Sequence, residues 1–226
     1  MNLSGKTAVI SGGNGGIGSA LVQELHAKGI NVYSLDIDGK IPQVIKGVHY
    51  ISVDLTDDHY TQEAMRLIRD SVDIVILATG TMRRGTIFES SEEDFDALFD
   101  TNLKAPWMLL KYIQPKLKNN AVIVQLSSGH ALNPEADPGL YTLTKKASSA
   151  LAEMVALTNP NYDVRTVYPG PVLTKLLLSG RTEPEKERIS KIAMAPAEFA
   201  KKFVELLESD KKTLQFVTND FSYALE

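Results

Sequence analysis

The sequence contains no cysteine, and this absence excludes several kinds of chemistry at once. Without a thiol, the 226-residue chain has no disulfide, no thiolate nucleophile and no cysteine-ligated metal. Its four histidines, His26, His49, His59 and His130, show no spacing typical of a metal site. We therefore expect a protein that holds no metal.

The sequence also lacks an excess of positive charge and a long apolar run. It carries 24 Lys and Arg against 28 Asp and Glu, so its net charge is -4. Proteins that bind nucleic acid usually carry a basic excess, and a membrane-spanning helix needs about 20 consecutive apolar residues. The start, Met1 followed by the polar segment NLSGK, does not resemble a secretion signal. We therefore expect a cytoplasmic protein with neither a nucleic-acid nor a membrane partner.

Hydrophobic residues make up 43% of the chain, and their pattern alternates between strand and helix. Short runs rich in β-branched residues predict strands, and the run DIVILAT is almost wholly apolar, as in a parallel strand buried on both faces. The predicted strands are 7–11, 31–36, 49–54, 73–79, 121–127, 164–168 and 214–218. The predicted helices are one that starts near Leu21 and ends before Gly29, followed by 57–69, 91–117, 141–157 and 197–207. In the segment 91–117, Pro106 and Pro115 are candidate kinks or boundaries.

This alternation predicts an α/β fold of the Rossmann type, in which a doubly wound parallel sheet lies between two layers of helices. No linker-like or low-complexity segment divides the chain, so we expect a single domain over residues 1–226. The most polar stretch, 179–191, fits either a solvated helix or a mobile lid, and its composition does not decide between them.

A glycine-rich segment, ISGGNGGIGSA, follows the first predicted strand and opens the first predicted helix. Its five glycines fit three spacings used by different nucleotide-binding proteins: G-x-G-x-x-G, G-x-x-G-x-x-G and G-x-x-x-G-x-G. In all three, glycines allow a tight turn, close approach of a pyrophosphate and close packing of helix on strand. The N-terminus of the helix then offers free N–H groups to the phosphates. The segment predicts a dinucleotide site, and the glycines alone do not choose the spacing.

Asp36 ends the second predicted strand, about 20 residues after the glycine segment, where an acidic side chain binds the ribose hydroxyls of NAD. A carboxylate at this place repels the extra phosphate of NADP. The glycine segment has no Lys or Arg, and the nearest basic residue after Asp36 is Lys40. We therefore expect NAD rather than NADP. Asp54, which ends the third predicted strand, either contacts the adenine edge or caps the next helix.

The segment YTLTK places Tyr141 and Lys145 one turn apart on one face of a predicted helix. A Lys ammonium stabilises a nearby phenolate, so we expect the pKa of Tyr141 to fall toward neutrality. Such a Tyr can pass a proton to or from a substrate oxygen. The pattern Y-x-x-x-K recurs by chance in many helices, and its weight comes from its neighbours. Ser128 follows the fifth predicted strand, at the edge where open α/β sheets build their sites.

In these motifs the chain resembles the short-chain dehydrogenase/reductase family, from GKTAVISGGNGGIG to about Ala200. The matching motifs, in order, are the glycine segment, Asp36, VDLTD, TNLKAP, IVQLSSGHA, YTLTK and VYPGPVLT. The resemblance implies that Tyr141 is the catalytic acid/base and that Ser128 holds the substrate oxygen. It also implies that Lys145 binds the nicotinamide ribose and lowers the pKa of Tyr141, and that Asn102 helps to anchor a water linking Lys145 to solvent.

The resemblance also implies a set of cofactor-binding residues. The family uses the spacing G-x-x-x-G-x-G, so its three motif glycines correspond to Gly12, Gly16 and Gly18. The segment after the sixth strand would frame the nicotinamide, with the backbone of Val172 on its carboxamide. The implied cofactor-binding residues are Gly12, Asn14, Gly16, Ile17, Gly18, Asp36, Asp54, Leu55, Ala78, Gly80, Tyr141, Lys145, Pro169, Gly170, Val172 and Thr174.

The chain departs from the family pattern at two ends. The fourth predicted strand ends in LATG, with Ala78 and Thr79 where the family has Asn-Asn-Ala-Gly or Asn-Ala-Gly. The C-terminal sequence FVTNDFSYALE lacks the Val-Asp-Gly-Gly ending that often contributes to tetramer contacts. The resemblance thus implies a homodimer rather than a tetramer. Trp107 and Met108 lie on the helix that pairs with its copy in family dimers, and ordinary core burial is the alternative for both.

Several residues near the expected site have two interpretations. His130 either lines the substrate pocket or is an ordinary loop residue. Arg83 and Arg84 either meet an anionic substrate or form a solvated basic pair, which is the simpler interpretation. The apolar stretch 173–180 either covers the substrate or packs in the core.

The expected function is an oxidoreductase that transfers a hydride between NAD(H) and a small alcohol or carbonyl substrate. The substrate would lie among the loops 81–88, 129–140 and 175–194, which vary freely on one fold. One alternative is a dinucleotide-binding sensor or regulatory protein with little or no turnover, although such a protein would be expected to lose the catalytic residues. Another is a sugar-nucleotide epimerase or dehydratase of the extended branch, for whose added substrate region the chain leaves little room.

Overall fold

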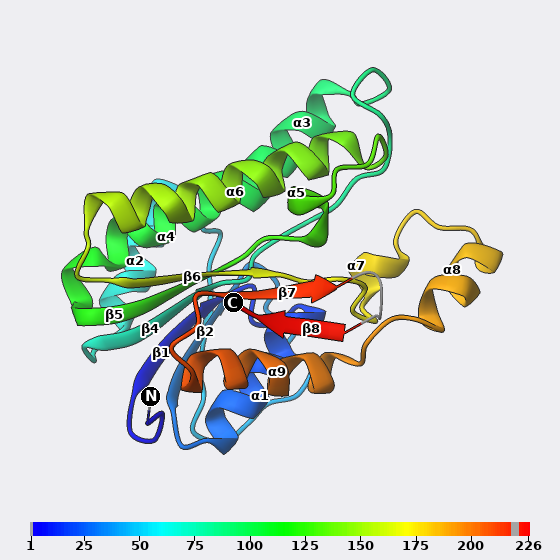
Figure 1. Ribbon diagram of the computed structural model, residues 1–226. Coiled ribbons are helices and arrows are strands. Elements are labelled where there is room, and N and C mark those ends of the chain that lie inside the picture. Colours follow the sequence, from blue (N-terminus) through cyan, green and yellow to red (C-terminus); the bar gives the residue numbers. More distant parts are fainter. Residues whose placement is uncertain (1, 218–221) are drawn as a thin grey trace.

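Within residues 2–217 and 222–226, which the computed structural model of the protein describes, eight strands form one sheet (Figure 1). The strands pair in the order β3-β2-β1-β4-β5-β6-β7-β8, and all neighbours are parallel except β7 and β8. The strands are β1 (Thr7–Ser11), β2 (Asn31–Asp36), β3 (His49–Ser52), β4 (Val72–Leu77), β5 (Leu117–Leu126), β6 (Asp163–Tyr168), β7 (Thr213–Val217) and β8 (Ser222–Leu225).

Helices cover both faces of this sheet, as the alternating pattern predicts (Figure 1). Helices α1 (Gly16–Ala27) and α9 (Pro196–Glu208) lie on one face, and α2 (Asp58–Leu67), α4 (Ala105–Ile113) and α6 (Gly139–Thr158) lie on the other. The remaining helices are α3 (Glu92–Phe99), α5 (Gly129–Leu132), α7 (Lys175–Leu178) and α8 (Glu183–Ser190). The single-domain, doubly wound α/β fold is therefore confirmed, with the antiparallel β8 as an exception to the expected parallel sheet.

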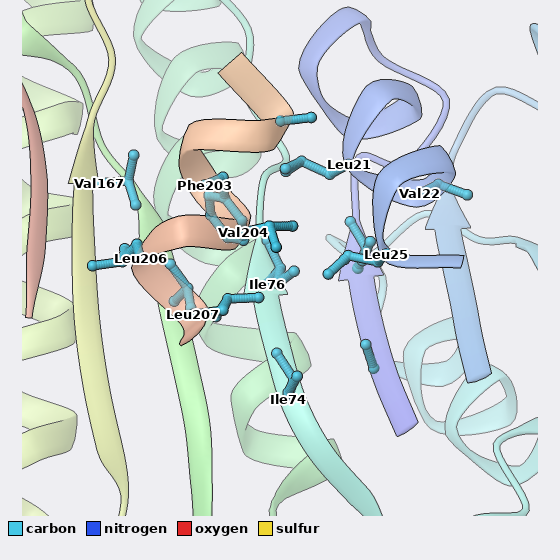
Figure 2. Close-up of a cluster of buried hydrophobic side chains, with 14 of the residues drawn as sticks. Leu21, Val22, Leu25, Ile74, Ile76, Val167, Phe203, Val204, Leu206 and Leu207 are labelled. Atoms are coloured by element: carbon cyan, nitrogen blue, oxygen red, sulfur yellow. The ribbon is translucent and has the colours of Figure 1, made fainter. Parts of the chain in front are cut away.

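Two apolar clusters hold the helices on the sheet, and β4 contributes to both. Ile74 and Ile76 pack with Phe203 of α9 in the cluster under α1 and α9 (Figure 2). Val75, between them in the sequence, belongs to the cluster on the opposite face. Successive side chains of a strand face opposite sides, so a central strand covered on both faces needs apolar residues at every position. This explains the wholly apolar sequence of β4.

The helical segment predicted over 91–117 is divided into several elements, with boundaries close to Pro106 and Pro115. A π-helical turn, Asp100–Lys104, separates α3 from α4, and a 3-10 turn, Gln114–Lys116, ends the segment. Pro106 lies in the first turn of α4, where a helix needs no N–H donor. Strand β5 begins at Leu117 rather than at 121. The three residues after Leu117, at 118–120, are polar and exposed, so they show no strand pattern.

Other boundaries differ by small amounts. The last predicted strand corresponds to β7, although Thr218 lies outside the described residues. The polar stretch 179–191 contains the helix α8, which buries none of its residues. The expected strand pattern did not include β8. No helix in the described part of the chain has both the length and the apolar character needed to cross a membrane.

Candidate active site

The carboxyl ends of β1 and β4 lie side by side and are joined by the side chain of Ser11. Its buried hydroxyl accepts hydrogen bonds from the backbone N–H groups of Ala78 (3.2 Å) and Thr79 (3.3 Å). These two residues form the unusual end of the fourth strand. The Ser11 hydroxyl therefore supports this strand end, which lies at the centre of the candidate site.

The glycine segment turns tightly against the same strand end. Gly12 has a φ of +70°, and a Cβ atom there would lie 2.8 Å from the backbone nitrogen of Thr79. A Cβ atom on Gly18 would lie 2.0 Å from the carbonyl oxygen of Gly12. Both positions require glycine, because the loop, the strand end and the first turn of α1 approach one another too closely for a side chain.

The start of α1 has the properties of an anion site. No side chain caps its first N–H groups, and its first turn contains no acidic residue, so the positive end of the helix dipole is not offset. Beside it, the Asp36 carboxylate accepts hydrogen bonds from the N–H groups of Asn14 (2.9 Å) and Asp38 (3.0 Å). Two buried atoms, Asn14 Oδ1 and Thr79 Oγ1, have no hydrogen-bond partner among the described residues. Uncapped N–H groups, a fixed carboxylate and unpartnered buried oxygens fit a bound dinucleotide.

Asp54 and its neighbours lie at the end of β3, but Asp54 does not cap a helix. Its Oδ1 atom accepts hydrogen bonds from the backbone N–H (2.9 Å) and hydroxyl (2.7 Å) of Thr56. The cap of α2 is Asp57, whose side chain accepts from the N–H of Tyr60. Leu55 is buried in the apolar cluster opposite α1, so its backbone is the part available to a ligand.

The predicted catalytic residues come together at the ends of β4 and β5. Tyr141 and Lys145 lie one turn apart on α6, and both are buried. Lys145 Nζ lies 5.8 Å from the centre of the Tyr141 ring and donates a hydrogen bond to the carbonyl of Leu126 (3.1 Å). Ser128 caps α5 just beyond β5 and forms a hydrogen bond with Tyr141. A Cβ atom on Gly80 would lie 3.4 Å from Lys145 Nζ, so the predicted cofactor residue Gly80 borders this group.

Burial shifts the pKa values of these two groups in opposite directions. It lowers the pKa of Lys145 to about 8, because a buried ammonium is desolvated. It raises the pKa of Tyr141 for the same reason, and the hydrogen bond from Ser128 opposes this rise. The expected fall in the pKa of Tyr141 is therefore wrong for the structure described, since desolvation of the phenolate outweighs the hydrogen bond from Ser128.

Asn102 is fully buried in the π-helical turn and acts through its side-chain amide. The amide accepts from the N–H of Thr81 (2.7 Å) and donates to the carbonyl of Thr81 (3.0 Å) and to the hydroxyl of Thr144 (2.9 Å). The Thr144 hydroxyl in turn donates to the carbonyl of Tyr141 (2.8 Å). Asn102 thus links the segment after β4 to the helix that carries Tyr141.

The segment after β6, which contains Pro169, Gly170, Val172 and Thr174, is held by residues that the sequence analysis missed. The Gly170 N–H donates to the hydroxyl of Tyr223 on β8 (3.0 Å). A Cβ atom on Gly170 would lie 2.2 Å from the ring of Phe216 on β7. No motif marks these aromatic residues. Phe216 lies in the predicted strand 214–218, whereas no strand was predicted at Tyr223.

Met194 holds the other end of this segment. Its backbone pairs with that of Val172, its N–H donates to the carbonyl of Pro171 (2.9 Å), and its carbonyl accepts from the N–H of Leu173 (2.9 Å). The side chain of Val172 is buried, whereas that of Ile17 is partly buried against the same cluster. The segment is therefore fixed on both sides.

The three predicted substrate loops meet beside Tyr141. Met82 of the first loop, Leu140 of the second and Leu176 of the third pack around Tyr141 in one small apolar cluster. The His130 ring stands edge-on to the Tyr141 ring, with centroids 5.9 Å apart. His130, in the short helix α5, therefore lies beside Tyr141. Among the described residues, no group of three or more His, Asp or Glu side chains is placed to hold a metal ion.

A model of the short chain dehydrogenase family matches residues 6–185. The chain belongs to this family. Oxidoreductase UcpA of Escherichia coli K12 is 27% identical, with 98% of this chain and 90% of the relative covered. An uncharacterized oxidoreductase of Thermotoga maritima is 29% identical, with 84% and 82% covered.

Solved structures agree with this assignment. A short chain dehydrogenase family protein from Francisella tularensis is 26% identical, and the two folds agree with a TM-score of 0.80 over 91% of each chain. The protein is therefore an oxidoreductase of the short chain dehydrogenase family, whose members transfer hydride with nicotinamide dinucleotides.

Tyr223→Phe tests whether β8 positions the segment that contains Gly170. The variant keeps the ring but removes the acceptor of the Gly170 N–H, which is worth about 1 kcal/mol, or roughly 5-fold in binding. We expect the KM for the dinucleotide to rise by about that factor with little change in kcat. Tyr60→Phe, at a side chain that is 60% exposed, is the matched control. A uniform loss of folded protein with unchanged KM would show a purely structural role.

Proposed function

We propose that the protein transfers a hydride between NAD(H) and the reacting carbon of a small alcohol or carbonyl compound, with Tyr141 exchanging the proton. The observation that carries this proposal is the grouping of Ser128, Tyr141 and Lys145 at the carboxyl ends of β4 and β5. Bound NAD(H) would supply or accept the hydride, and the protein supplies orientation and a proton. The neighbouring family members named above are oxidoreductases, which agrees with this chemistry.

Each of the three side chains has a distinct role in this proposal. Ser128 donates a hydrogen bond that orients the substrate oxygen. Tyr141 gives its proton to that oxygen in reduction and takes it back in oxidation. Because burial raises its pKa, Tyr141 stays protonated at neutral pH, which suits it to donate. Lys145, with a pKa of about 8, is largely an ammonium at pH 7 and stabilises the phenolate that forms.

The residues that would hold the cofactor follow from the geometry of the strand ends. The loop from Gly12 to Gly18 and the uncapped N-terminus of α1 would bind the pyrophosphate. Asp36 would bind the adenosine ribose, and the segment 169–174 would frame the nicotinamide. Among the described residues, no Lys or Arg forms an ion pair with Asp36, so its negative charge is not compensated there. This supports NAD rather than NADP.

Tyr141→Phe tests the proton transfer. We expect kcat to fall by about 100- to 10,000-fold, because the general acid is lost. Binding of NADH, followed by fluorescence titration, should stay unchanged. Tyr162→Phe is the control, because the Tyr162 ring packs against the cluster that contains Val75 and not against the cluster around Tyr141. Full activity in Tyr141→Phe would contradict the proposal, and wild-type binding of NADH without turnover of any alcohol or ketone would favour a sensor.

Asp36→Ala tests the cofactor preference. A hydrogen bond to a charged group is worth about 1.5–3 kcal/mol, so the ratio of kcat/KM for NAD to that for NADP should fall by about 10- to 100-fold. Asp38→Ala removes the same charge from an exposed position two residues away and should leave the ratio unchanged. A wild-type enzyme that prefers NADP would contradict the assigned role of Asp36.

We also propose that the protein is a homodimer through α4 and α6. Trp107 is 47% exposed and lines a mostly apolar hollow with Phe99, Leu103 and Leu151, to which Asp100 and Lys104 also contribute. Met108, in contrast, is buried in the core. A half-exposed Trp in an apolar patch is typical of a protein interface. The altered C-terminal sequence gives no support for a tetramer.

Trp107→Glu tests this surface by sedimentation velocity. A charge at the centre of the patch should convert the wild-type dimer to monomer, because a buried unpaired carboxylate opposes association. Phe88→Glu, at a side chain that is 99% exposed on a substrate loop, should leave the mass unchanged. A wild-type monomer, or a dimer that persists in Trp107→Glu, would contradict this interface.

A further inference from the structure

Two arginines from different substrate loops lie close together near His130, whose ring stands edge-on to Tyr141. Arg84 belongs to the loop 81–88, and Arg181 lies just after α7 in the loop 175–194. The stem of Arg84 packs on Gly180, where a Cβ atom would lie 3.4 Å from Arg84 Cγ. Burial, followed by the charge of Arg84, lowers the pKa of Arg181. The two cations therefore lie within each other's field.

The described carboxylates compensate this pair only in part. Arg84 Nη1 lies 3.3 Å from one oxygen of Asp137, whose other oxygen accepts from the N–H of Gly85 (2.8 Å). Arg84 Nε is buried and has no hydrogen-bond partner among the described residues. Arg181 Nε donates to the carbonyl of Leu177 (2.9 Å), and no carboxylate of the described chain lies within ion-pair distance of Arg181.

The nearby carboxylate of Glu185 on α8 also has hydrogen-bond partners of its own. Glu185 raises the pKa of Arg181, but its Oε2 atom accepts from the N–H (2.8 Å) and hydroxyl (2.7 Å) of Thr182 at the start of the helix. Arg188, on the same helix, adds a further positive charge to the field at Arg181. The acidic groups therefore hold the loops in shape and leave guanidinium donors unused.

Two partly buried like charges without full compensation are unfavourable, unless an anion binds between them. A guanidinium group presents a fixed fork of donors that matches a carboxylate or phosphate. The adjacent Arg83 offers a contrast, because its side chain is 52% exposed and its Nε lies 3.7 Å from Asp94. The interpretation of Arg83 and Arg84 as a solvated basic pair therefore applies to Arg83 alone.

The arginine pair is connected to Tyr141 through His130. His130, edge-on to Tyr141, has a pKa lowered first by burial and, among nearby charges, by both Arg84 and Arg181, against the opposing charges of Glu135 and Asp137. Met82 and Leu176 form the apolar surroundings of Tyr141. A molecule that extends from Tyr141 toward the loops thus passes from an apolar region to a cationic one.

We propose that Arg84 and Arg181 bind an anionic oxygen group, a carboxylate or a phosphate, on the part of the substrate remote from the carbon that exchanges the hydride. The inference rests on the proposed function and narrows its substrate class to hydroxy acids, oxo acids or their phosphate analogues with a short apolar chain. Arg84 and Arg181 are the specificity-determining residues for that anion.

The first experiment compares charged substrates with uncharged ones. Wild-type enzyme with NAD is assayed on short hydroxycarboxylates and their methyl esters, and on hydroxyalkyl phosphates and the corresponding diols. We expect kcat/KM to be about 10- to 100-fold higher for the anionic member of one of these pairs, the size of a charge-assisted hydrogen bond. The pair that responds distinguishes a carboxylate from a phosphate, and faster turnover of the uncharged members would overturn the proposal.

The second experiment uses Arg181→Met, which breaks no ion pair, and Arg84→Met. In each, KM for the anionic substrate should rise about 10- to 100-fold, while kcat/KM for its uncharged partner stays the same. Arg84→Lys keeps a charge and should recover part of the loss. Arg83→Met removes an equal charge one residue away and should change nothing. An equal loss for both members of the pair would show that the arginines only shape the loops.

A third measurement needs no turnover, so it separates this inference from the proposed function. Hydroxycarboxylates and hydroxyalkyl phosphates are titrated into the wild-type NADH complex and the Arg181→Met complex by calorimetry. Anion binding that is lost in Arg181→Met, together with no turnover of any substrate, would contradict the oxidoreductase proposal and support the anion site. Turnover of uncharged alcohols without anion binding would support the oxidoreductase proposal and contradict the anion site.

Discussion

The carboxyl end of β4 is the constraint on which the candidate site depends. Strand β4 lies between β1 and β5, is buried on both faces, and is followed by Ala78, Thr79 and Gly80. Ser11 bonds to the first two, Gly12 has no room for a side chain because of them, and Gly80 borders Lys145. The glycine loop and the helix that carries Tyr141 and Lys145 are therefore positioned against the same few backbone atoms.

The strand end LATG has no asparagine, and side chains from neighbouring elements hold its backbone. The strand end is held by the hydroxyl of Ser11 from one side and by the amide of Asn102, through Thr81, from the other. The side chains of Ser11 and Asn102 are fully buried. Because an unpaired polar group is costly there, loss of either set of hydrogen bonds would destabilise the fold. In this chain the strand end is therefore held by side chains of neighbouring elements.

Much of the fold could be predicted from the sequence, because β-branched runs and helical spacing report burial directly. The run DIVILAT identified a central strand, and the order of the motifs identified the family. The π-helical turn within 91–117 could not be predicted, because it depends on the contacts of Asn102 with Thr81 and Thr144. The rise in the pKa of Tyr141 was missed because spacing along a helix says nothing about desolvation. The nearness of Arg84 and Arg181 is tertiary, and no local pattern reports it.

The hairpin of β7 and β8 connects the edge of the sheet to the interior of the site. Sheet edges have few packed neighbours and open at lower free energy than the core of a domain. In this protein the edge carries the hydroxyl that bonds to Gly170 and the ring that lies against it. Fraying of a few peripheral residues would therefore loosen the segment 169–174, the proposed frame of the nicotinamide, while the central strands stay intact. The upper working temperature of the enzyme would then be set by its outermost strand, below the temperature at which the domain unfolds.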